Sequence, residues 1–186
     1  MAIRDLKQYI DVHRELYKHL NFDGEGIEVV LKGHLLLESV LHKILENSAK
    51  NQRKIAAADL SFYKLACIVQ ALFEDRCAPW VWKAVSDLNT IRNKIAHNLE
   101  YPGIEAMVDD FKEYVRSHDD GTMEAGDEFE FSELPMAIVS VHSQLWRLLD
   151  GLRPNPLLQP TPLDAAGASR VGLGPARLNN TLEEYK

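Results

Sequence analysis

The sequence predicts an all-α protein, an antiparallel bundle of five to six helices followed by an irregular tail. Apolar residues recur at intervals of three and four over most of residues 1–150, and no two segments alternate in the manner of paired strands. With 186 residues, of which 46% are hydrophobic, one domain can bury a core without a disulfide or a metal. We therefore expect a helical domain over 1–150 and a disordered or docked appendage over 151–186.

Six helices are predicted from the apolar spacing, at about residues 3–20, 26–47, 59–73, 80–97, 104–117 and 132–149. The breaks between them contain the residue types expected at helix ends. Residues 21–26 include two glycines, and Pro79 stands at the start of the fourth helix. Pro102 and Gly103 follow that helix. Pro135 is compatible with the last helix because it lies in the first turn.

The third helix has the composition of a buried element. Asp59 or Ser61 can cap its N-terminus, and residues 65–73 carry no charge. We expect this helix to be mostly buried, with Cys67 packed among its apolar side chains. The preceding residues 48–58 are polar and basic, and we expect them to form a loop.

The net charge of -7 is concentrated in one segment. Residues 101–150 contain three Lys and Arg against 12 Asp and Glu, whereas residues 1–100 contain 14 against 13. Much of this acidity lies in 118–130, which is expected to be a solvated loop. Because the first 100 residues are nearly neutral, the composition does not exclude binding to nucleic acid.

Composition also bears on compartment. Cys67 and Cys77 form no CxxC pair, so neither a disulfide scaffold nor a thiolate zinc site is indicated. Charged residues among the first 20 positions exclude an apolar signal core, and the uncharged run 134–146 is too short to span a membrane. The sequence predicts a soluble, cytoplasmic protein. The tail, with five prolines and four glycines in residues 151–186, cannot build a core of its own.

The most informative segment is 92–97 (Arg-Asn-Lys-Ile-Ala-His), at the end of the fourth predicted helix. Arg92 borders the apolar stripe, and its guanidinium offers a planar fork suited to phosphate oxygens. His97 is a proton-transfer group near neutral pH. On an ideal helix these two side chains point about 140° apart. They can meet only if the helix ends after Ala96 or if a second copy of the chain contributes one of them.

An arginine, an asparagine and a histidine suffice for RNA cleavage without a metal or a cofactor. The histidine accepts the 2′-hydroxyl proton, the 2′ oxygen attacks the adjacent phosphorus, and the arginine stabilises the charge on the phosphate. The product is a 2′,3′-cyclic phosphate. Asn93 adds an amide that can hold a phosphate, a ribose hydroxyl or the imidazole.

At these residues the sequence resembles the HEPN superfamily (higher-eukaryote and prokaryote nucleotide-binding domains). Its signature is an Arg, usually followed by a polar residue, with four to six positions before a His; Arg92, Asn93 and His97 match it. The helix order over about 25–150, with a short third helix opening at 59–61 (Asp-Leu-Ser), is also similar to the mannitol-operon-repressor branch. The resemblance implies an all-α bundle and a metal-independent endoribonuclease, often a toxin or phage-defence component. It also implies a two-fold dimer that pools the motifs of both chains.

Glu38 lies on the apolar stripe of the second helix, with His34 and His42 four residues to either side. The three could face one ligand, but their spacing matches no standard catalytic zinc motif, and no metal site is predicted. Because a lone buried carboxylate is costly, we expect Glu38 to pair with Arg92 or with a backbone donor. Pairing with Arg92 would orient the guanidinium.

Basic residues outside the motif pair are candidates for contact with the RNA backbone: Lys94, Lys50, Arg53 and Lys54. The alternative for the last three is a solvated loop.

Two functions are compatible with these residues. In the first, the protein is a dimeric endoribonuclease of HEPN type with RNA as substrate and an antitoxin as a candidate partner. His97 is then the general base, Arg92 stabilises the phosphate and Asn93 positions the reacting groups. In the second, it is a non-catalytic regulator or protein-interaction module similar to the repressor branch. Arg92 and Glu38 then belong to an ion-pair network at a subunit contact.

Overall fold

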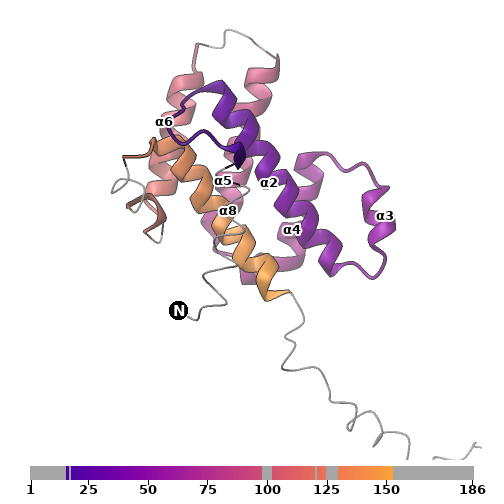
Figure 1. The fold of residues 1–186 in the computed structure, drawn as a ribbon. Helices are drawn as coiled ribbons and strands as arrows, with labels where there is room; N and C mark the ends of the chain where they lie inside the picture. The colour runs from indigo at the N-terminus through magenta and orange to yellow at the C-terminus, as the bar shows by residue number, and fades with distance from the viewer. Residues whose placement is uncertain (1–15, 17, 98–101, 120, 125–129, 153–186) are drawn as a thin grey trace, which may run out of the picture. The chain divides into compact units, whose positions relative to one another are not determined.

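The computed structural model describes residues 16, 18–97, 102–119, 121–124 and 130–152, and within them the protein is all-α with no strand. The elements, shown in Figure 1, are α2 (Ile27–Ser48), α3 (Gln52–Ala56), α4 (Phe62–Phe73), the 3-10 turn η1 (Glu74–Arg76), α5 (Pro79–His97), α6 (Ile104–Arg116) and α8 (Glu133–Gly151). The predicted all-α class is confirmed. The five predicted helices that fall on described residues begin and end within three residues of their expected limits.

Helix α2 is the central element, and it packs against α4, α5 and α8 (Figure 1). Its buried residues follow the predicted stripe: Val29, Val30, Gly33, His34, Leu37, Val40, Leu41, Ile44 and Leu45. The approach to α8 is close at Gly33, where an added β-carbon would lie 2.5 Å from Cδ1 of Ile138. Ile138 is fully buried, so its side chain has little room to move away. The packing of α2 on α8 therefore favours a glycine at this position, because a larger residue would force one of the two helices or the Ile138 side chain to shift.

Helices α5, α6 and α8 complete the bundle. α6 packs on both α5 and α8 and buries Phe111 and Val115. The segment after α6 is held to α8 through Asp119. Its Oδ2 accepts hydrogen bonds from the backbone N–H groups of Gly121, at 3.0 Å, and of Met123, at 2.7 Å. Its Oδ1 accepts one from the hydroxyl of Ser140.

A short helix, α3, occupies part of the segment predicted to be a loop. Asn51 makes it possible, because its side-chain oxygen accepts a hydrogen bond from the N–H of Lys54 at 3.3 Å and so caps the first turn. The helix packs against α2 at the edge of the bundle (Figure 1). Its residues are exposed apart from the half-buried Ile55. The expectation of a solvated segment is therefore correct for its exposure and wrong for its conformation.

Helix α4 is less buried than its composition predicts. The side chains that it buries are Phe62, Leu65 and Val69. Its exposed large apolar side chains are Tyr63, Ile68 and Leu72, at 65%, 37% and 56% exposure. Cys67, which was expected in the core, is exposed on the same helix, whereas Cys77 is buried. The reason is geometric: α4 packs against α2 and α5 with one side only, and its apolar residues continue around the other.

Several expectations fall wholly or partly outside the described residues. These are the first helix at 3–20, of which only the end is described, six of the 13 residues of the acidic loop at 118–130, and the appendage after residue 152. Leu16 and Leu20, at the end of that first segment, are described and belong to the buried core. None of the described helices is both long and apolar enough to cross a membrane.

Replacing Gly33 with alanine is expected to lower the free energy of unfolding by about 1–2 kcal/mol, measured by urea denaturation. Overpacking costs roughly 1–3 kcal/mol, and we expect the upper part of this range because Ile138 is fully buried, which leaves a net loss after the ~1 kcal/mol that alanine gains over glycine inside a helix. Ile138→Val removes the nearest atom, so the double variant should lose less than the sum of the two single losses. Gly151→Ala is the control, since a β-carbon there meets nothing within 4 Å. A Gly33→Ala variant as stable as the wild type would contradict the close contact.

Candidate functional site

A groove with a volume of about 620 Å³ opens between α2, the start of α4 and α5. α2 contributes Leu31, His34, Leu35 and Glu38, the start of α4 contributes Ser61, Phe62 and Tyr63, and α5 contributes Asn89, Arg92 and Asn93. The groove thus joins two residues of the motif to Glu38. Leu31, Leu35 and Tyr63 are exposed although they are apolar or aromatic, so the polar groups lie beside an uncovered apolar surface.

His34 is the most buried polar group of the groove, at 4% exposure. Its Nε2 lies 3.2 Å from Oδ1 of Asn89, and its ring stacks on Phe62 with the ring centroids 4.0 Å apart. Because an amide oxygen can only accept a hydrogen bond, Nε2 carries the ring proton and donates the hydrogen bond to Oδ1 of Asn89. Nδ1 is therefore the unprotonated nitrogen of the neutral ring.

The surroundings of His34 favour the neutral imidazole. Desolvation by burial lowers the pKa of His34 below its ordinary value of 6.5, and the positive charge of Arg92 acts in the same direction. The hydrogen bond with Asn89 and the carboxylate of Glu38 act in the opposite direction but do not reverse the shift. At neutral pH this ring is thus a proton acceptor without a charge of its own.

Arg92 is half-buried, and its Nη1 donates a hydrogen bond to Oδ1 of Asn93 at 3.2 Å. Glu38 lines the same groove, but no Arg92–Glu38 ion pair forms, and no other carboxylate of the described residues reaches this guanidinium. The expected ion pair between Glu38 and Arg92 is therefore wrong. Glu38 is only half-buried, so water can solvate its carboxylate and the need for a buried cation does not arise. The guanidinium retains donors for an anionic ligand.

His97 lies apart from Arg92. α5 remains helical through His97, so the helix does not end after Ala96 and the side chains keep their angular separation of about 140°. His97 is exposed and does not line the groove. It follows Asn93 by four residues, which places the two on neighbouring turns of the same helix face. One chain by itself does not bring Arg92 and His97 together.

The basic residues predicted to contact RNA also lie outside the groove. Lys94 is exposed in the last turn of α5, and Lys50, Arg53 and Lys54 are exposed in and before α3. Asn89 lines the groove but was missed in the sequence. Its spacing of three and four residues from Arg92 and Asn93, which places it on the same helix face, is the signal that could have identified it.

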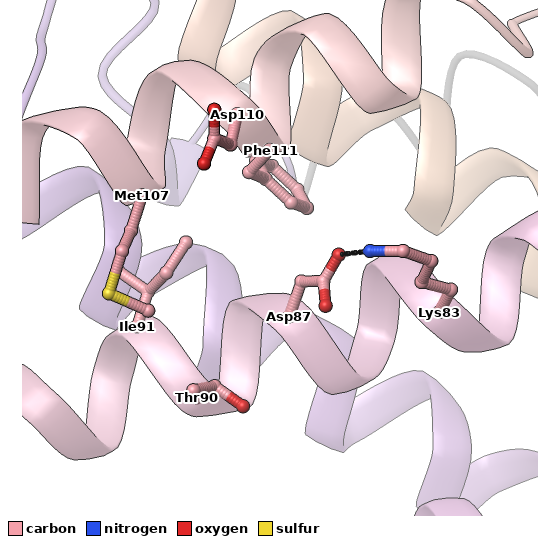
Figure 2. Close-up of a pocket in the computed structure, with 7 residues that line it drawn as sticks. All are labelled: Lys83, Asp87, Thr90, Ile91, Met107, Asp110 and Phe111. Carbon is pink, nitrogen blue, oxygen red and sulfur yellow. Dashed lines mark hydrogen bonds and ion pairs between the residues drawn. The ribbon is translucent and has the colours of Figure 1, made fainter.

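The described part of the chain contains no group of His, Cys, Asp or Glu side chains arranged to hold a metal ion. His34 and Glu38 share the groove, whereas His42 does not line it. A second pocket, of about 180 Å³, lies between α5 and α6 (Figure 2). Figure 2 shows Asp87 directed toward Lys83, 2.5 Å away on the same helix, so the pocket's cation is already paired. This pocket contains none of the motif residues.

The depressed pKa of His34 predicts a pH dependence of stability. The unfolded chain binds a proton at this ring below about pH 6.5, more readily than the folded chain, so folding stability falls as the pH drops through that value toward the folded pKa. His34→Gln removes this contribution. Its free energy of unfolding should therefore fall less between pH 7 and pH 5 than that of the wild type, measured by urea denaturation. His42→Gln is the control, and equal pH dependence in wild type and His34→Gln would contradict the assignment.

Comparisons with known proteins identify no relative from which a function could be transferred. The chain matches no family model, and neither a curated protein nor a solved structure shows a significant match to it. The functional assignment therefore depends on the residues of the groove and on the motif at the end of α5.

Proposed function

We propose that the protein is a metal-independent endoribonuclease whose site is the Arg92 groove completed by a second copy of the chain. The observation that carries the proposal is Arg92 itself. This guanidinium is half-buried in a groove, hydrogen-bonded to Asn93 and without an ion pair to a described carboxylate. Such a group is suited to a phosphate. The resemblance of Arg92 and His97 to the HEPN signature supports the same chemistry.

The groove has the size and the side chains for a nucleotide. Its volume of about 620 Å³ is within the usual range for small-molecule sites. Tyr63 is 65% exposed at its edge and offers an aromatic face on which a base can stack. Asn89 and Asn93 add amides that hydrogen-bond a ribose hydroxyl or a base edge.

Cleavage of RNA requires two proton transfers: one group accepts the 2′-hydroxyl proton and another protonates the leaving 5′ oxygen. His97 is a candidate for one of these roles only if a second chain presents it to the groove. The exposed apolar and aromatic side chains that line the groove suit such a pairing: Leu31, Leu35 and Tyr63, which we name the α2–α4 face. A two-fold axis through this face would cover it with the same residues of a second chain and place the two grooves next to the subunit interface.

The second candidate function is a non-catalytic regulator or interaction module, and the α2–α4 face favours it as well, because an uncovered apolar surface suits any protein partner. The ion pair between Arg92 and Glu38 that this alternative expected is not formed. An antitoxin remains a candidate partner for the toxin form of the first function. Catalysis distinguishes the two proposals.

The purified protein is expected to cleave single-stranded RNA in the presence of a chelator and to leave 2′,3′-cyclic phosphate and 5′-hydroxyl ends, identified by mass spectrometry. Arg92→Ala should lower kcat by about 100-fold or more, because the phosphate charge loses its stabilising donor, and His97→Ala should lower it by a similar factor. Arg76→Ala, an exposed arginine in η1, is the control and should retain full activity. Intact RNA, or cleavage that survives Arg92→Ala, contradicts the proposed function.

The composite site makes a separate prediction. Chains carrying Arg92→Ala and chains carrying His97→Ala, each inactive alone, should together recover about a quarter of the wild-type activity, since half of the dimers are mixed and each mixed dimer holds one intact site. Leu35→Glu on the α2–α4 face should abolish both dimerisation, measured by analytical ultracentrifugation, and cleavage, whereas Ala57→Glu next to α3 should change neither. A wild-type protein that cleaves RNA as a monomer would refute the shared site.

A further inference from the structure

The groove contains an imidazole of its own, and it is not the histidine of the motif. We propose that His34 is the general base of the reaction, accepting the 2′-hydroxyl proton while Arg92 of the same chain holds the phosphate. His97 is then left for the second proton transfer, to the leaving oxygen. This inference rests on the proposed ribonuclease function and changes its assignment of the base.

The first support is position. His34 and Arg92 line one groove of one chain, whereas His97 is outside it. The ring of His34 is held from two sides, by the stack on Phe62 of α4 and by the hydrogen bond to Asn89 of α5. A proton acceptor needs this restraint, because proton transfer depends on a defined distance to the reacting hydroxyl.

The second support is the protonation state that the contacts impose. Donation from Nε2 to Asn89 leaves Nδ1 as the nitrogen with a free electron pair. Burial keeps the pKa of His34 below its usual value, so the ring is neutral and able to accept at pH 7. The other titratable groups lining the groove are Glu38 from α2, Tyr63 from α4 and Arg92 from α5. Arg92 favours the neutral ring and Glu38 favours the charged one, so Glu38 stabilises the imidazolium once the proton has been taken.

The proposed step is balanced. The 2′-hydroxyl proton passes to Nδ1 of His34, and the electron pair of the 2′ oxygen forms a bond to phosphorus. The bond from phosphorus to the 5′ oxygen breaks, and that oxygen takes a proton from His97 of the second copy. The products are a 2′,3′-cyclic phosphate and a 5′-hydroxyl, and His34 returns its proton to solvent. The negative charge on the phosphate oxygens in the transition state lies next to Arg92.

A buried histidine that hydrogen-bonds an asparagine also serves folding, so the test needs a measurement that a structural role would not change. His34→Gln keeps a donor for Asn89 and removes the base. We expect kcat to fall about 100-fold or more, while the Kd for an uncleavable 2′-O-methyl RNA stays within about twofold of wild type. His42→Gln is the matched control, because His42 lies on the same helix two turns away and does not line the groove. It should retain the wild-type kcat.

A second variant changes the basicity of His34 without removing it. Asn89→Asp places a carboxylate on Nε2, which stabilises the imidazolium, and should therefore move the acid limb of the kcat/KM profile to higher pH by about one unit or more. The His34 ring resonance in the NMR spectrum should titrate at correspondingly higher pH. In a chain that already carries His34→Gln, the additional Asn89→Asp substitution should leave the pH profile of kcat/KM unshifted.

Each outcome bears on a different claim. If the wild type cleaves RNA and His34→Gln retains that activity while Arg92→Ala loses it, the inference about His34 is overturned and the proposed function stands. If the wild type leaves RNA intact, both are overturned. If His34→Gln does not fold, the Asn89→Asp profile decides: a shifted acid limb that follows the titration of the ring supports the inference, and an unshifted limb overturns it.

Discussion

The groove depends on one side chain that joins three helices. His34 belongs to α2, stacks on Phe62 at the start of α4 and hydrogen-bonds Asn89 of α5. Because Phe62 is itself buried, the stack fixes where α4 begins relative to α2, and the hydrogen bond fixes the face of α5 that turns toward them. Arg92 and Asn93 are one turn further along that face. The placement of the phosphate-binding candidates is thus a consequence of how a single polar group is satisfied inside the bundle.

The sequence was sufficient to predict most of the fold but less of the site. The limits of α5 followed from Pro79 at its start and Pro102 with Gly103 beyond its end, and helix periodicity identified the buried stripe of α2. The prediction that Glu38 pairs with Arg92 was wrong because it assumed that both side chains are buried, whereas both are half-buried. The degree of burial depends on how the helices cross, which the periodicity of a single helix does not describe. The prediction of a loop over 48–58 failed for a different reason, since a basic, polar stretch is compatible with either a loop or a short helix, and here Asn51 caps one.

The exposure of α4 shows a further limit of sequence patterns. An uncharged run such as 65–73 indicates which side chains avoid water, but it does not indicate whether the same chain or another molecule covers them. In this protein the chain covers one side of α4 and leaves Tyr63, Ile68 and Leu72 outside. The composition of α4 therefore identifies its apolar residues but not which of them the bundle buries. The separation of Arg92 from His97 has another cause, since α5 stays helical through His97 and the two side chains leave it in different directions.

The two cysteines of the chain differ in their exposure to solvent. Cys67 is exposed on α4, one turn from Tyr63, whereas burial raises the pKa of the Cys77 thiol to about 11 and leaves almost no reactive thiolate at neutral pH. A maleimide dye should therefore attach to Cys67 selectively. The natural sequence thus provides a single labelling position for fluorescence measurements, with no engineered cysteine and none to remove.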